Sequence, residues 1–328
     1  MRNIYLILIF NLLIINFLNA QDSIRRNEFT PDLDGILKTK FEYDTENDLN
    51  RFSVRNARFG AKGQVNNYIS YRAEVDLSDE GKIKMLDAFV KYTPLKGLDI
   101  YLGQRKIPFG TDYLRSPADN MFANRSFVAK YVNDGLRDIG VVISYKSTIK
   151  IPFEIWAAAL NGTGSNNPQW KEKPNLGGRL VLGPVYGLSV KGNLYTGETD
   201  NQINLNILGG ELSYASKNFL IESEFVSKSW SDTLSSDFES QGLYIHTFYQ
   251  FKLKSEKIKY IMPTMRYDVM GKTIAISGKT TERFTVGVNF GLEPKKFISE
   301  IRFNYEHYYK SSLSNHTNKF TIEFIARF

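Results

Sequence analysis

The chain has 328 residues, enough for two ordinary domains or one large barrel, and its mean hydropathy of -0.31 excludes a helical membrane protein. Its formal net charge of +7 is a modest excess, which suits anionic solutes or lipid headgroups and not a nucleic-acid-binding surface. Cysteine is absent, which excludes disulfides, thiolate metal sites and a lipoprotein anchor.

The first 20 residues contain the only strongly apolar run of the sequence. A positive Arg2 precedes an apolar stretch over 4–18, which two Asn residues interrupt, and Ala20 offers a small residue for cleavage. A membrane-spanning helix requires about 18 consecutive apolar residues. We therefore expect a cleavable signal peptide over 1–20 and not an anchor helix, followed by a periplasmic N-terminal segment over 21–32.

From residue 33 to residue 328 the sequence repeats one pattern. About ten residues alternate between apolar and polar, and a polar break follows. The sixteen segments that show it are approximately 33–44, 50–65, 67–78, 83–93, 97–105, 136–146, 150–160, 174–182, 186–196, 203–215, 218–229, 241–254, 258–269, 281–292, 297–307 and 318–328. No helical period of comparable strength interrupts them. The pattern predicts one all-β domain over 33–328, an antiparallel sheet of about 16 strands.

The breaks between these segments alternate in length. Those at 106–135 and 161–173 are long, whereas those at 94–97 and 183–185 are short. A transmembrane β-barrel has this asymmetry, because its periplasmic turns are short and its outward loops are long. An even number of strands also places both termini at the periplasmic rim. The sequence therefore predicts a barrel in the outer membrane of a Gram-negative bacterium.

A soluble sandwich would also contain strands with one apolar face, so the strands alone do not separate the two classes. The aromatic side chains beside the short turns favour the membrane barrel, because such barrels carry aromatic girdles at the level of the lipid headgroups. These side chains are Tyr92, Tyr145, Tyr186, Tyr214, Phe297 and Phe328. Sixteen strands also enclose more space than side chains fill, so we expect lipid outside and an aqueous lumen inside.

One segment breaks the alternation. Within 50–65 the apolar positions change parity near Asn56, which predicts a β-bulge. This change would direct Arg55, Arg58 and Lys62 into the lumen.

In the stretch YLGQRKIPFG a strand ends in a basic pair, Arg105 and Lys106, and in Pro108, which cannot continue a strand ladder. About 25 residues without a clean period follow, and loops of that length in compact structures are usually functional. By strand count, residues 106–135 are the third outward loop. We interpret them as a candidate constriction loop.

Four stretches together resemble the phosphate-selective porin O and P family: FSVRNARFGAKGQV, MLDAFVKYTPLKGLDIYLGQRKIPFG, RDIGVVISY and the terminal FTIEFIARF. The resemblance covers nearly all of the chain after residue 20. It implies a trimeric 16-stranded porin whose third outward loop folds into the lumen, with inward Arg and Lys residues that guide anions. It also implies that Phe328 is the signal read by the barrel-assembly machinery.

An anion that enters a narrow channel exchanges water for Arg and Lys donors. The candidates are Arg105, Lys106, Arg115, Arg125 and Lys130 in the loop, with Arg55, Arg58, Lys62, Arg179, Lys191 and Arg283 from the wall. For each of these alone, a solvated or salt-bridged side chain is the alternative. The inward face also pairs Arg72 with Glu74 and carries Glu222 and Glu224. We therefore expect passive diffusion of small hydrophilic solutes with a modest preference for anions such as phosphate.

Two other functions remain as alternatives. A barrel hydrolase would have to use one of the three His residues, but the sequence has no H-x-x-x-H, no nucleophile elbow and no Cys. The carboxylates of SDEGK lack the spacing of a calcium loop, so neither a metal nor a cofactor is expected. A barrel with a closed pore could instead bind or adhere through its outward loops. The expected partners are outer-membrane lipid and small solutes, without nucleic acid.

Overall fold

The computed structural model describes residues 30–78, 81–132, 137–198, 204–231, 237–275, 280–293, 298–309 and 316–328. The signal peptide predicted over 1–20 and nearly all of the segment predicted over 21–32 lie outside the described residues, as does Phe297. No helix in the described ranges is long and apolar enough to cross a membrane.

Seventeen strand segments make up one sheet. They are β1 (Asp32–Asp44), β2 (Leu49–Gln64), β3 (Ile69–Asp76), β4 (Lys84–Leu95), β5 (Leu98–Lys106), β6 (Arg137–Ser147), β7 (Phe153–Leu160), β8 (Asn175–Val185), β9 (Leu188–Glu198), β10 (Asn204–Ala215), β11 (Phe219–Ser231), β12 (Asp237–Tyr249), β13 (Phe251–Lys252), β14 (Tyr260–Gly271), β15 (Thr280–Glu293), β16 (Ile298–Tyr309) and β17 (Lys319–Arg327).

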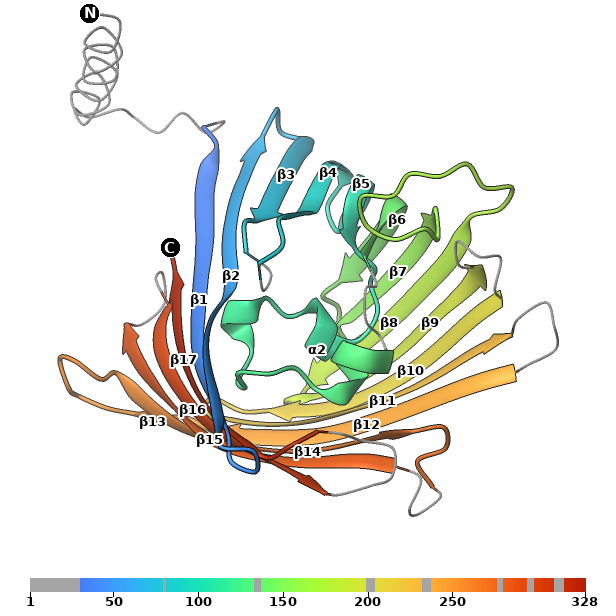
Figure 1. The fold of residues 1–328 in the computed structure, drawn as a ribbon. Helices are drawn as coiled ribbons and strands as arrows, with labels where there is room; N and C mark the ends of the chain where they lie inside the picture. The colour runs from blue at the N-terminus through green and yellow to red at the C-terminus, as the bar shows by residue number, and fades with distance from the viewer. Residues whose placement is uncertain are drawn as a thin grey trace, which may run out of the picture.

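The sheet closes into a barrel because β1 pairs with both β2 and β17 (Figure 1). All pairings are antiparallel, and β12 and β13 both pair with β14. Only Gln250 separates β12 from β13, so the two are parts of one strand, and seventeen segments minus one give sixteen strands. The predicted 16-stranded antiparallel barrel is confirmed. At the closing seam, Gly35 and Phe328 exchange backbone hydrogen bonds of 3.0 and 3.1 Å.

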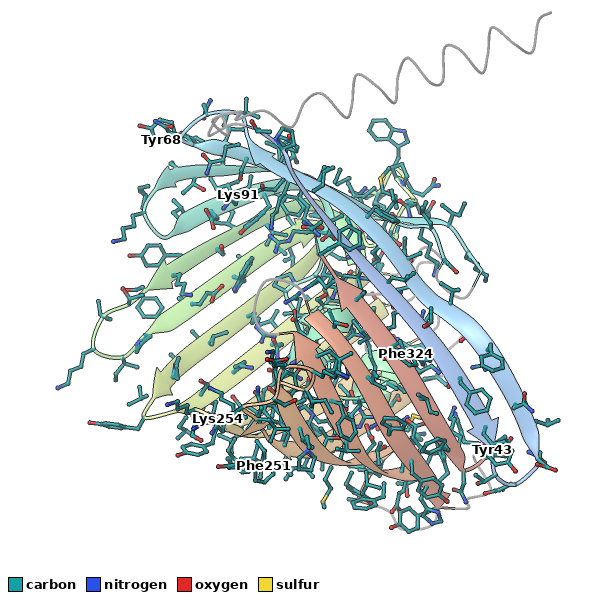
Figure 2. The ribbon with its side chains drawn as sticks, turned by 90° about the vertical axis from the view of Figure 1, so that its left-hand side faces the viewer. Tyr43, Tyr68, Lys91, Phe251, Lys254 and Phe324 are labelled. Atoms are coloured by element: carbon teal, nitrogen blue, oxygen red, sulfur yellow. The ribbon has the colours of Figure 1, made fainter. Side chains whose placement is uncertain are left out.

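The two faces of the wall differ as the alternation predicts. Large apolar side chains project from the outer face, with Leu102 63% and Phe324 54% exposed (Figure 2). The aromatic residues beside the short turns are exposed as well, and Tyr186 at 98% is the most exposed of them. Charged side chains such as Lys38 and Glu323 are buried on the inner face. A barrel in lipid requires this inverted arrangement.

The predicted bulge lies in β2. Lys38 pairs with Asn56 and Thr39 pairs with Val54, so Arg55 is the extra residue of this strand. The parity of β2 therefore changes at Arg55, next to the predicted position. After the change Arg58 and Lys62 lie on the inward side, where both line a cavity.

The connection between β5 and β6 contains three short turns of helix. They are α2 (Thr111–Leu114), the 3-10 turn η2 (Pro117–Asp119) and the π turn η3 (Val128–Val132). Pro117 stands at the start of η2, where its fixed φ suits a helical turn and its missing N–H costs no hydrogen bond. Figure 1 draws these turns within the outline of the barrel. Residues 107–132 are called the β5–β6 connection below; the last part of the predicted loop lies outside the described residues.

Candidate functional site

The β5–β6 connection packs on the inner side of the wall through an apolar core. Its Ile107, Phe109 and Val128 are at most 2% exposed. They pack against inward residues of β6 to β12, namely Val142, Ala158, Leu160, Tyr195, Leu205, Ile207, Val226 and Tyr244. These wall positions are apolar because the connection covers them, whereas an inner face in contact with water would be polar.

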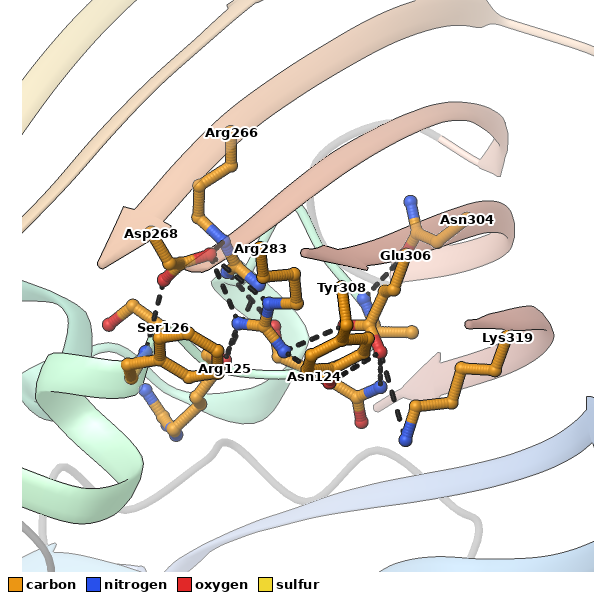
Figure 3. Close-up of polar contacts among 12 residues, drawn as sticks. Asn124, Arg125, Ser126, Arg266, Asp268, Arg283, Asn304, Glu306, Tyr308 and Lys319 are labelled. Atoms are coloured by element: carbon orange, nitrogen blue, oxygen red, sulfur yellow. Dashed lines mark hydrogen bonds and ion pairs between the residues drawn. The ribbon is translucent and has the colours of Figure 1, made fainter. Parts of the chain in front are cut away.

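A second contact of the connection is polar and involves β14, β15 and β16 (Figure 3). Arg266 donates to the carbonyl oxygen of Asn124 at 3.0 Å, and Arg283 donates to that of Arg125 at 2.8 Å. Asp268 accepts a hydrogen bond of 3.0 Å from the backbone N–H of Phe127. The same Arg283 forms ion pairs with Asp268 at 3.1 Å and with Glu306 at 2.9 Å. These guanidinium groups therefore bind both the backbone of the connection and the carboxylates of the wall.

Asp112 joins the two halves of the connection. Its carboxylate accepts hydrogen bonds from the N–H and hydroxyl of Ser126 at 2.9 and 2.7 Å, and it lies 3.7 Å from the Arg125 guanidinium. Burial acts to raise the pKa of Asp112, but Arg125 and the other nearby guanidinium groups outweigh burial and hold this pKa below its usual value. Asp112 is therefore charged at neutral pH.

The carboxylates of β10 and β11 bind the start of the connection. Arg115 forms an ion pair of 2.6 Å with Glu222, and the N–H groups of Thr111 and Asp112 donate to Glu224 at 3.1 and 3.2 Å. Glu211 of β10 accepts a short hydrogen bond from the Thr111 hydroxyl. It also forms ion pairs with Arg179 at 3.0 Å and Lys191 at 3.1 Å. Wall carboxylates therefore balance three of the predicted anion-binding residues.

A cavity of about 850 Å³ lies beside β1 to β5, on the side where the connection does not form this apolar core. We call it the basic cavity. Its lining residues are Asp32, Leu33, Asp34, Gly35, Ile36, Arg58, Lys62, Arg72, Glu74, Asp87, Phe89, Arg105, Lys106, Leu114, Ser116, Arg137, Arg327 and Phe328. Seven of these residues are basic and four are acidic, a difference of three positive charges.

Most of the basic side chains of the cavity have carboxylate partners. Arg72 lies 2.8 Å from Asp34, and Arg137 lies 2.7 Å from Asp87. The more exposed Lys62 is 3.7 Å from Asp34. Arg58 and Arg327 pair with carboxylates that do not line the cavity, Asp76 at 3.0 Å and Asp119 at 2.7 Å.

Arg105 and Lys106 differ from these residues. Within the described ranges, neither has a carboxylate within 4.0 Å. Lys106 donates to three carbonyl oxygens of the connection, those of Tyr113, Leu114 and Arg115, at 2.7 to 3.1 Å. The Arg105 guanidinium lies 3.8 Å from the ring centroid of Tyr101, and its buried Nη1 has no hydrogen-bond partner among the described residues. The guanidinium charge of Arg105 is therefore one that no described carboxylate within 4.0 Å neutralises.

The predicted site residues thus fall into separate groups. The basic cavity brings together Arg58, Lys62, Arg105 and Lys106. The contacts between connection and wall contain Arg115, Arg179, Lys191 and Arg283, while the Arg125 side chain pairs with Asp112 inside the connection. Arg55 is half-buried at the bulge, and Lys130 is exposed in η3. Sequence reasoning missed Arg137 and Arg327. The structure brings Arg137 to the site because it pairs with Lys106 at the end of β5.

Each of the three His side chains lies against an aromatic ring, and His307 meets Tyr309 edge to face with ring centroids 5.0 Å apart. His246 is buried, stacks on Tyr244 with ring centroids 5.1 Å apart and lies 3.5 Å from Glu222. His316 stacks on Tyr308 in the same way, at 5.0 Å. Across the part of the chain that the structure describes, no group of three His, Cys, Asp or Glu residues could hold a metal ion.

Residues 34–212 match the sequence model of the family "Phosphate-selective porin O and P". The chain belongs to this family. The resemblance noted in the sequence is thereby confirmed, and the match covers more than half of the chain. A comparison with curated proteins found no match.

Solved structures of porins share the fold. The anion-selective porin from Comamonas acidovorans is 12% identical, with a TM-score of 0.64 over 92% of this chain and 99% of that one. Salmonella typhi OmpF, in complex with daunomycin, is 13% identical, with a TM-score of 0.64 over 93% and 99%. The trimer form of Vibrio cholerae OmpT is 11% identical, with a TM-score of 0.59 over 92% and 100%. Together with the family match, they establish an outer-membrane porin of a Gram-negative bacterium.

Proposed function

We propose that this porin prefers small anions, phosphate among them, and that their path runs through the basic cavity between the β5–β6 connection and β1 to β5. The observation that carries the proposal is the pair Arg105 and Lys106, whose charges have no carboxylate partner in the described ranges while the other basic residues of the lining do. Uncompensated positive charge at a narrow place raises the local concentration of anions. The family name and the anion-selective relative support the same preference.

The connection narrows the channel in this proposal. Its apolar core against β6 to β12 and its polar contacts to β14, β15 and β16 leave the basic cavity as the passage. Because ion pairs line much of that cavity, the preference for anions is modest, and small neutral solutes also pass.

Several further features belong to the proposal. The protein acts as a channel and not as an enzyme, a role that the match to a porin family supports. It assembles as a homotrimer, as one OmpT form does. Residues 1–20 are a signal peptide, residues 21–32 lie in the periplasm, and the barrel-assembly machinery reads Phe328.

The test is conductance in planar bilayers. The folded protein should give ohmic channels whose reversal potential in a KCl gradient indicates chloride over potassium. The double variant Arg105→Gln, Lys106→Gln should lower the chloride-to-potassium permeability ratio several-fold. Lys254→Gln, which removes an exposed charge from the turn between β13 and β14, is the control and should leave the ratio unchanged. Absence of conductance would contradict the proposal and favour a barrel that binds through its outward loops.

A further inference from the structure

An inward row of aromatic side chains surrounds Arg105. The rings of Phe89 on β4 and Tyr101 on β5 are 5.5 Å apart and meet edge to face. The ring of Trp156 on β7 stacks on Tyr101 at 5.9 Å. The guanidinium of Arg105 lies 3.8, 5.4 and 5.0 Å from the ring centroids of Tyr101, Phe89 and Trp156. Such cation–π contacts fix the position of the charge without neutralising it.

This row is unusual for a water-filled passage. Phe89 lines the basic cavity together with Ile36 and Leu114. None of these side chains can donate a hydrogen bond to an anion. A compact inorganic anion would lose water against them and gain nothing in return. A solute with an apolar body would gain from their burial.

Arg105 and Lys106 differ in the hydrogen-bond donors that they can offer to a solute. Lys106 donates its hydrogen bonds to three carbonyl oxygens of the connection, so it has no donor left for a solute. Arg105 retains unused donor capacity, since its buried Nη1 has no partner among the described residues. A planar guanidinium is well suited to a planar carboxylate. The volume of about 850 Å³ is also within the range of small-molecule sites and much larger than one phosphate needs.

We propose that the basic cavity preferentially takes organic monoanions with an apolar body of ring size, whose carboxylate lies at Arg105 and whose ring lies against Phe89. This inference rests on the anion preference proposed above and adds the class of solute. Inorganic phosphate and chloride pass through the same place with weaker retention.

The test compares benzoate with acetate, which carries the same carboxylate without the ring. Each is added to the full-length folded protein in a planar bilayer that carries a chloride current. Benzoate should reduce the current with a half-blocking concentration at least tenfold below that of acetate. This comparison needs no variant, so it tests the preference for a ring-bearing carboxylate even if a cavity substitution impairs folding.

Variants then locate the effect. In Phe89→Ala, and in the strand-compatible Phe89→Thr, the ratio of the two half-blocking concentrations should fall to about threefold or less. Phe324→Ala on the lipid-facing side of β17 is the matched control, where the tenfold ratio should persist. Equal half-blocking concentrations in the unchanged protein, or an unchanged ratio in both Phe89 variants, would overturn the inference. If the channel still favours chloride in that case, the proposed anion preference survives; a reversal potential that favours potassium would contradict that preference instead.

Discussion

Arg115 of the β5–β6 connection and Glu222 of β11 form an ion pair of 2.6 Å, although 107 positions separate them in the sequence. The carboxylate side chain is 2% exposed and the guanidinium 16%. Removing one member of such a buried pair leaves an uncompensated charge and costs about 3–5 kcal/mol. This pair is therefore a main attachment of the connection to the wall.

We expect Glu222→Gln to loosen the connection. The melting temperature should fall, and the single-channel current should become larger or noisier at the same voltage. Lys254, exposed in the turn between β13 and β14 and away from both the connection and the basic cavity, provides the control, since Lys254→Gln should change the stability by less than about 0.5 kcal/mol and leave the current noise unchanged. Identical noise in the two variants would contradict the role given to Glu222.

The charge of Asp112 predicts a pH dependence. Because the pKa of Asp112 is held below its usual value, its contribution to stability is fully present above the ordinary carboxyl pKa of about 3.8. It is lost only when the pH falls through the lowered value. The part of the conductance that depends on the charge of Asp112 should therefore be constant from pH 7 to about pH 4. Asp112→Asn should give an altered conductance already at pH 7, and a transition of the unchanged protein above pH 4 that this variant abolishes would count against the assignment.

The wall of the barrel could be predicted from the sequence because its physics is local. Period-2 alternation follows from the strand itself, so Phe324 on the outside and Glu323 on the inside could be placed by parity. The bulge at Arg55 was visible for the same reason. Strand number also followed from counting segments, apart from the break at Gln250.

The connection could not be predicted in the same way, because its contacts join residues far apart in the chain. Ile207 and Val226 are inward and apolar, which is explained only by Phe109 and the rest of the connection packing on them. Glu222 and Glu224 looked unpaired in the sequence, yet Arg115 supplies the missing cation. Segments without a period give no register, so the partners of a loop remain undetermined until the fold brings them together.

The bulge gives an unusual prediction for a deletion in a membrane strand. Deleting Arg55 removes the extra residue of β2 in its register with β1, so Val54 and Asn56 become neighbours and both halves of β2 keep their pairings with β1. The variant should still fold, as judged by heat-modifiable migration on a denaturing gel. Deletion of Thr285, which pairs in register with both Arg266 and Glu306 in the regular strand β15, is the comparison. It moves the inward Arg283 to the lipid side and should abolish folding. Loss of folding in both deletions would show that the bulge itself is required.

The seam between the two ends of the barrel gives the last prediction. Gly35 lies under the ring of Phe328, and a Cβ atom added to Gly35 would lie 2.4 Å from that ring. Gly35→Val should therefore displace Phe328, open the pairing of β1 with the C-terminus and reduce the yield of folded barrel in the outer membrane. Gly210→Ala on β10 is the matched control, because an added Cβ there meets no atom within 4 Å. Its yield should equal that of the unchanged protein. If Gly35→Val assembles at the normal yield, the contact between this glycine and the terminal ring does not contribute to closure.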